Sequence, residues 1–141
     1  MSRGRAKVGF ALLAMPAVVR AALRCAWLER QLTLEDLVAR LRETPPFAVR
    51  ALRRPEWLLA TLDRVLPLLP PWHYGACLKR SLLLLDLWSR CELKPALHLG
   101  VRRDGASDRH RAHAWVTVAA WPAGTVAPAT SSEGYPEAFS L

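Results

Sequence analysis

Cys77 and His113 are the two residues whose types and spacing could do thiol chemistry. Cys77 stands at the front of "CLKRSLLLLDLW", and His113 opens "HAWVTV" 36 residues later. A cysteine nucleophile needs a thiolate and a partner that carries the proton. A cysteine at the N-terminus of a helix lies in the positive end of the helix dipole, which favours the thiolate. Backbone N–H groups at the same helix end could hold an oxyanion, so the pair could attack an acyl group.

The same residues also have a structural interpretation, because one cysteine and one histidine in a chain are more often structural than catalytic. Cys25 and Cys91 serve as internal controls: each lies inside or at the end of an apolar helical segment, where cysteine acts as a small hydrophobic residue. Three cysteines without a CxxC spacing argue against a disulfide framework and against a zinc site. Reduced thiols in a cytoplasmic protein fit better, and no cofactor is expected.

His113 opens a segment that alternates as a strand does, so its neighbours divide between two faces. One face carries His113, Trp115 and Thr117, and the other carries Ala114, Val116 and Val118. If the second face packs on the helix that carries Cys77, His113 faces outward to a cleft. His98, in "ALHLGVR", is interpreted as a hydrogen-bonded histidine on the less buried face of its own strand.

The elements that must position this pair begin with a helical N-terminal part. Apolar spacing predicts a helix over 6–32 that bends near Pro16. A second helix lies in "LTLEDLVARLRET", where Thr33 can cap it and Asp36 follows three residues later. A third begins at Pro55. After the proline-rich "PLLPPWHYGA", a helix over 77–90 is apolar almost all round, which is typical of a central helix.

Two strands follow these helices. They are predicted over 96–102 and 113–119, with a polar loop and the turn signal Asp104-Gly105 between them. The tail beyond is weakly patterned. Helices, then a buried helix, then a hairpin predict an α+β fold. A length of 141 residues predicts one domain, with a helical part over 1–66 and a core over 67–141.

The net charge of +8 is concentrated in the N-terminal part of the chain. Residues 1–54 hold eleven Arg and Lys against four Asp and Glu, a balance of +7, whereas residues 55–141 hold nine against eight. Such an excess suits an acidic peptide, a nucleic acid or an anionic membrane surface, or it is a solvated Arg-rich face. No nucleic-acid motif is present, so nucleic acid is not expected as a partner. A weak membrane-surface contact through the basic N-terminal helix is one expectation.

The first residues have the charged start and apolar run of a signal peptide. The run from Val8 to Val19 is too short to cross a bilayer, and apolar residues continue at helical spacing beyond Arg20. The pattern therefore favours a packed or surface-lying amphipathic helix over a cleaved signal, and a cytoplasmic location.

Three segments together resemble a known family. "CLKRSLLLLDLW", "ALHLGVRR" and "HAWVTV" are similar to the leader peptidases of lasso-peptide biosynthesis, which belong to the transglutaminase-like cysteine-protease superfamily. The match covers Pro70–Val118 well, and the helical front resembles the family only in character. The resemblance implies that the core over 67–141 is cysteine-protease-like. The chain is too short to include the leader-recognition domain of the fused form, so it resembles the stand-alone form. The resemblance implies three partners: the precursor peptide, a separate leader-recognition protein and the lasso cyclase.

The resemblance also implies a Cys-His-Asp triad that cleaves the leader from the precursor. Cys77 and His113 match by motif. The stretch "AAWPAGTVAPATSSEG", where relatives have the acid, contains no Asp, and Thr117 replaces the common Glu of the family motif. Glu133 is the candidate third member. Alternatively, an amide or a carbonyl orients the imidazole, or the protein is a non-catalytic scaffold of the same fold within the biosynthetic complex.

Overall fold

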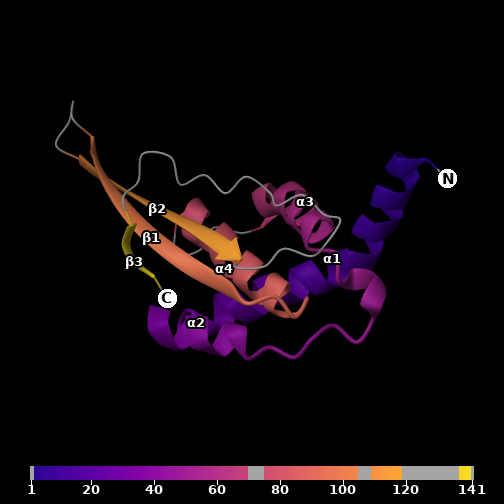
Figure 1. Cartoon of the computed structure of the whole chain (residues 1–141), viewed down its shortest axis with the longest axis horizontal. Coiled ribbons are helices and arrows are strands. Elements are labelled where there is room, and N and C mark those ends of the chain that lie inside the picture. Colours follow the sequence, from indigo (N-terminus) through magenta and orange to yellow (C-terminus); the bar gives the residue numbers. More distant parts are fainter. Residues whose placement is uncertain (1, 70–74, 105–108, 119–136, 141) are drawn as a thin grey trace.

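The computed structural model describes residues 2–69, 75–104, 109–118 and 137–140, with side chains at 2–69, 75–100 and 113–118. Within these residues, four α-helices precede three strands, which confirms the α+β class. The outer half of the long hairpin extends past the helices, whereas its inner half lies across α4 (Figure 1). The elements are α1 (Arg3–Leu28), α2 (Leu34–Arg42), η1 (Arg50–Leu52), α3 (Pro55–Val65), η2 (Leu66–Leu68), α4 (Ala76–Ser89), β1 (Pro95–Asp104), β2 (Arg109–Val118) and β3 (Glu137–Ser140).

Helix α1 begins three residues before its predicted start and ends four residues early, at Leu28. It ends there because Thr33, the N-cap of α2, has an extended backbone. Between the two helices, the amides of Gln31 and Leu32 both donate hydrogen bonds to the carbonyl of Leu28. Pro16 lies inside the continuous helix. Its ring is exposed, so water can satisfy the carbonyl that loses its amide partner.

The apolar part of α1 is longer than the sequence predicted. By length and composition α1 could cross a membrane, and it is the one such helix among the residues that the structure describes. One face of α1 nevertheless belongs to the protein core, where Ala14, Val18 and Ala21 are fully buried. The prediction of a helix that packs against the rest of the protein is therefore confirmed.

Thr33 caps α2 as predicted. Its hydroxyl oxygen accepts a hydrogen bond of 3.3 Å from the amide of Asp36, and its own proton is donated over 2.9 Å to the Asp36 carboxylate. This reciprocal pair satisfies one of the amides that the first helical turn leaves unbonded. Leu37, Val38 and Leu41 then face the core.

Helix α4 is the centre of the fold, as its all-round apolar pattern predicted. It contacts α1, α2 and α3 and also β1 and β2. Lys79 and every residue from 81 to 88 are buried, whereas Arg80 is partly exposed. The indole N–H of Trp88 donates a hydrogen bond of 3.2 Å to the carbonyl of Pro55, which ties α4 to the start of α3. A single apolar cluster joins these helices to Leu97, Ala114 and Val116 of the hairpin.

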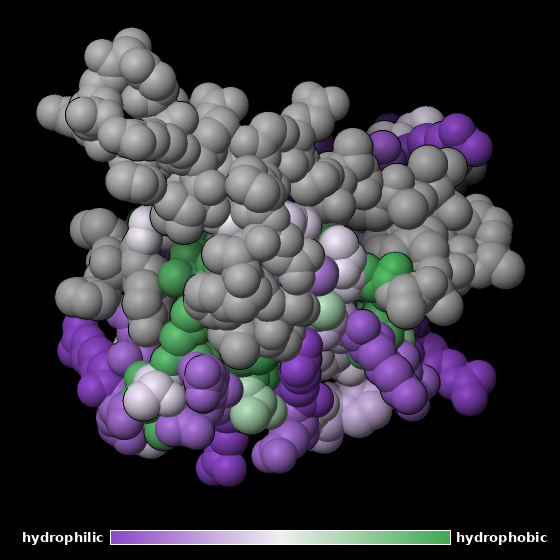
Figure 2. All heavy atoms as spheres, turned by 60° about the vertical axis from the view of Figure 1, so that its left-hand side comes forward, coloured by the Kyte–Doolittle hydropathy of each residue, from purple (hydrophilic) through white to green (hydrophobic). Residues whose placement is uncertain are grey.

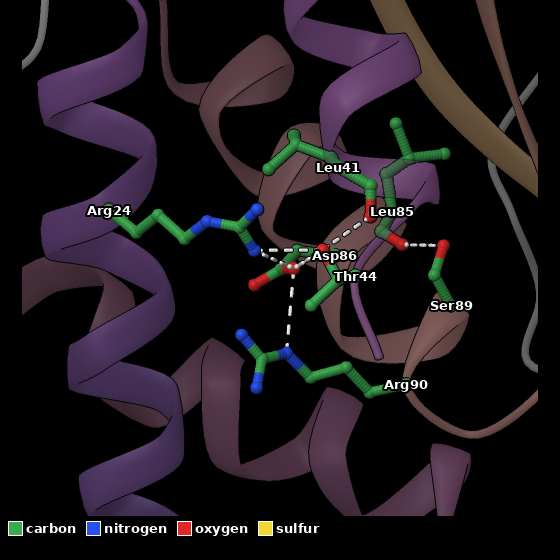
Figure 3. A network of polar contacts seen from close by, with 7 residues as sticks. All are labelled: Arg24, Leu41, Thr44, Leu85, Asp86, Ser89 and Arg90. Carbon is green, nitrogen blue, oxygen red and sulfur yellow. Dashed lines mark hydrogen bonds and ion pairs between the residues drawn. The ribbon is translucent and has the colours of Figure 1, made fainter. Parts of the chain in front are cut away.

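A buried carboxylate fixes the C-terminal end of α4, and nothing in the sequence pattern predicted it. Asp86 is fully buried, and its Oδ1 lies 2.8 Å from the Thr44 hydroxyl, 3.4 Å from Arg24 Nη1 and 3.5 Å from Arg90 Nε (Figure 3). The Thr44 hydroxyl also accepts a bond of 2.8 Å from Arg24 Nη1. The network links α1, the end of α2 and α4 by charge-assisted contacts.

The three strands form one antiparallel sheet in the order β2-β1-β3. β1 and β2 pair from Pro95 with Val118 to Asp104 with Arg109, so both strands continue into the segment predicted as a polar loop. The strands are longer than predicted because backbone hydrogen bonds extend a ladder whatever the polarity of the side chains. β3 was not predicted, and it pairs with the middle of β1.

The described surface near the hairpin carries both kinds of side chain. Figure 2 shows apolar side chains between hydrophilic ones on this side of the molecule.

Two charged pairs lie on the outer surface of the helical part. Arg80 binds Asp63 through contacts of 2.7 and 3.2 Å, and Arg53 binds Glu92 over 2.9 Å. Both pairs are exposed enough for water to screen them.

Candidate active site

Cys77 lies in the first turn of α4 and is exposed to solvent. Gly75 forms the N-cap in an extended conformation, and as a glycine it has no side chain with which to cap the first amides. Ala76 is exposed as well. The first amides of a helix have no partner within the helix, so those beside Cys77 are suited to receive an oxyanion.

The helix behind Cys77 is rigidly held. Lys79, two residues beyond the cysteine, is buried, and so is each residue from 81 to 88. Arg80 is partly exposed and adds a link to Asp63 on α3. An exposed thiol therefore stands at the end of a helix whose main part is packed in the core, which is the arrangement that a nucleophile needs for a defined approach to a substrate.

His113 lies on β2, and the predicted division of this strand between two faces is confirmed. Ala114 and Val116 are buried in the core cluster, and Val118 packs against it. His113 is half-buried on the opposite face, and its ring stacks on Trp115 with a centroid distance of 5.9 Å and an angle of 21°. Stacking on an indole restricts the orientation of the imidazole.

A second histidine shares this face. His98 stands directly opposite Trp115 in the ladder, and the two rings stack with centroids 5.6 Å apart. His98 Nε2 and the Thr117 hydroxyl share a hydrogen bond of 2.6 Å. The interpretation of His98 as a hydrogen-bonded histidine on the less buried face is therefore confirmed. Trp115 was not recognised as the ring that both histidines contact, although the cross-strand register implies it.

The two elements of the predicted pair are neighbours. Helix α4 contacts β2, and β2 lies across it (Figure 1). The direct pairing of the Cys77 thiol with the His113 ring stays a prediction. Glu133, the candidate third member, lies outside the described residues.

Cys25 and Cys91 differ from Cys77 in their surroundings. Cys25 is fully buried, and Cys91 is partly buried against the core. Burial raises the pKa of the Cys25 thiol to about 12, with a further upward contribution from the charge of Asp86. Burial likewise raises the pKa of Cys91 to about 12, although the Arg53 charge acts in the opposite direction. Both thiols are held in the protonated, unreactive form.

Among the residues that the structure describes, no group of three or more His, Cys, Asp and Glu side chains could hold a metal ion. Asp86 is the one acidic residue buried in the described core, but it is engaged by Thr44 and two arginines at the far end of α4. Its role is therefore to hold the helices together.

Comparison with known proteins gives one match. A family model described as "Transglutaminase-like superfamily" matches residues 15–132. The match extends into the helical half, beyond the segments whose motifs carried the resemblance. No curated protein and no solved structure shows significant similarity to the chain. Because the matched region covers most of the sequence, the chain belongs to the transglutaminase-like superfamily.

Proposed function

We propose that this protein is a cysteine peptidase that removes the leader peptide from a ribosomally made lasso-peptide precursor. It acts with a separate leader-recognition protein and beside the lasso cyclase. The carrying observation is the contrast among the three cysteines: Cys77 is exposed at the front of a fixed helix, whereas Cys25 and Cys91 are buried in the core or packed against it. The superfamily, which includes cysteine peptidases, and the three motifs support the same conclusion.

The proposed reaction has two steps. In the first, His113 takes the proton of the Cys77 thiol, and the sulfur attacks the scissile carbonyl. The C–N bond then breaks, His113 gives the proton to the leaving amine, and a thioester joins Cys77 to the leader. In the second step, water loses a proton to His113 and attacks the thioester, which releases the leader as a carboxylate and restores the thiol.

The test combines the purified protein, its precursor peptide and its leader-recognition protein, and follows intact masses in a single turnover. We expect wild type to release the leader, and Cys77→Ala and His113→Ala to lose cleavage by about a thousandfold or more. Cys91→Ala is the matched control, because it removes a thiol of the same chain without touching the site. Cleavage that persists in Cys77→Ala would contradict the proposal.

A second candidate function is a non-catalytic scaffold of the same fold within the biosynthetic complex. The observation in its favour is the absence of Asp from residues 119–134, where the related peptidases have their acid. The same experiment separates the two functions. Wild-type protein that binds its partners without cleaving the precursor supports the scaffold.

A further inference from the structure

The outer face of α1 is an apolar surface that no other described element covers. Eight large hydrophobic side chains are exposed among the residues whose side chains the structure describes, and six of them lie on this one helix. Five of the six share a face, because they follow one another at intervals of four, seven, four and four residues. We call these five the α1 outer stripe: Val8, Leu12, Val19, Leu23 and Trp27.

The stripe cannot be part of a membrane span while the fold is intact. The opposite face of α1 is in the core, where Ala14, Val18 and Cys25 have no exposed surface. If α1 were to cross a bilayer, this face would leave α3 and α4, which it contacts. A binding partner that contacts only the outer face of α1 is compatible with the structure. A helix that lies in the plane of a membrane interface makes this kind of contact.

The charge of α1 indicates which kind of partner would cover the α1 outer stripe. Residues 3–28 contain five Arg and Lys and no Asp or Glu. One of the five, Arg24, is directed inward to Asp86, and the other four are exposed: Arg3, Arg5, Lys7 and Arg20. Arg5 and Arg20 each stand three residues before a member of the stripe, so they lie beside it on the helix. Cations beside an apolar stripe match a bilayer that presents anionic headgroups above an apolar interior. Trp27, 60% exposed at the end of the stripe, is a residue that favours such an interface.

We propose that the α1 outer stripe docks the protein on an anionic lipid surface. The stripe runs for about 28 Å along one convex helix, at ~1.5 Å per residue, and a bilayer can cover such a ridge without a shaped groove. A second copy is the less suitable occupant, because two helices with cations and no acids would repel each other. This inference is independent of the peptidase proposal, since it concerns a different face and a different measurement.

The test measures co-sedimentation of the full chain with vesicles. We expect binding to phosphatidylcholine vesicles that contain about one third phosphatidylserine, and much weaker binding to phosphatidylcholine alone. Leu12→Gln/Leu23→Gln should weaken the binding at least about tenfold. Arg5→Gln/Arg20→Gln should weaken it several-fold and reduce its dependence on salt. Arg24 is left unchanged, because it belongs to the Asp86 network.

The matched control is Val49→Gln/Leu68→Gln, which replaces the two exposed hydrophobic residues that lie off α1. It should bind vesicles as wild type does, and circular dichroism should show the same helix content in all variants. The proposal is overturned if wild type does not bind anionic vesicles, or if the stripe variant and the control bind equally well. A wild-type dimer in light scattering that the stripe variant loses, without any vesicle binding, would assign the stripe to a second copy.

Discussion

The two ends of α4 differ in almost every physical respect. At the N-terminal end, Gly75, Ala76 and Cys77 are exposed, and no side chain of the N-cap residue covers the first amides. At the C-terminal end, Asp86 is fully buried and bound by Arg24 of α1, by Thr44 just after α2 and by Arg90 at the end of α4. One helix thus carries an exposed thiol at one end and a buried anchor at the other. The difference shows what the proposed nucleophile requires: an exposed thiol is accurately placed only on a helix that is fixed elsewhere.

Loss of the anchor should give the largest change in stability. Asp86→Ala leaves Arg24 and Arg90 without their shared carboxylate in a partly buried site, so we expect the free energy of unfolding to fall by about 3–5 kcal/mol. Asp63→Ala is the matched control, because its ion pair with Arg80 is exposed and should contribute less than about 1 kcal/mol. Urea denaturation measures both. Equal losses in the two variants would show that the buried network is not an anchor.

The three thiols should differ strongly in reactivity. Burial raises the pKa of Cys25 and of Cys91 to about 12 from an ordinary 9, so below pH 9 their thiolate fraction is lower by about a thousandfold. We expect alkylation at pH 7.5 to label Cys77 at least about a hundredfold faster than either. Their labelling should rise about tenfold per pH unit toward pH 12 while the fold holds. Mass mapping of the labelled peptides would refute the contrast if Cys25 or Cys91 reacted first.

Glu133→Ala tests whether a carboxylate orients His113. An imidazole works best with a fixed acceptor on its second nitrogen, because the acceptor selects the tautomer and stabilises the imidazolium. We expect single-turnover cleavage to slow by about tenfold to a hundredfold. Glu137→Ala, which removes the other downstream acid, is the control. Full activity in Glu133→Ala would mean that another group orients the ring.

The smallest expected effect is that of Cys77 on stability. The side chain is exposed, so Cys77→Ala should change the free energy of unfolding by less than about 0.5 kcal/mol. Thermal denaturation of this variant beside Asp86→Ala measures the contrast between the two ends directly. A loss of several kcal/mol in Cys77→Ala would give this cysteine a structural role.

Local patterns in the sequence predicted the features that depend on local physics. The Thr33 cap, the central helix and the two faces of the second strand follow from spacing over a few residues, and each is confirmed. β3 could not be predicted, because pairing with a distant strand gives a short segment no pattern of its own. The Asp86 network joins residues 62 and 42 positions apart, and local periodicity carries no information at such separations.

For the candidate site, the sequence separated the three cysteines correctly by their surroundings. Cys25 and Cys91 were interpreted as packed because apolar residues surround them, and Cys77 as available because it begins a helix. The stack of His98, Trp115 and His113 was missed, because it requires the register of the hairpin as well as the alternation within each strand. The distance from Cys77 to His113 depends on how α4 docks on β2, which no local pattern determines.

The central claim is that the exposed end of α4 is a peptidase nucleophile. The most direct measurement is intact-mass analysis of wild-type protein during one turnover with its precursor and its leader-recognition protein. We predict a transient covalent adduct of the leader that maps to Cys77, followed by release of leader and core. The claim would be contradicted if wild type released the leader without any adduct at Cys77 and Cys77→Ala released it at an undiminished rate.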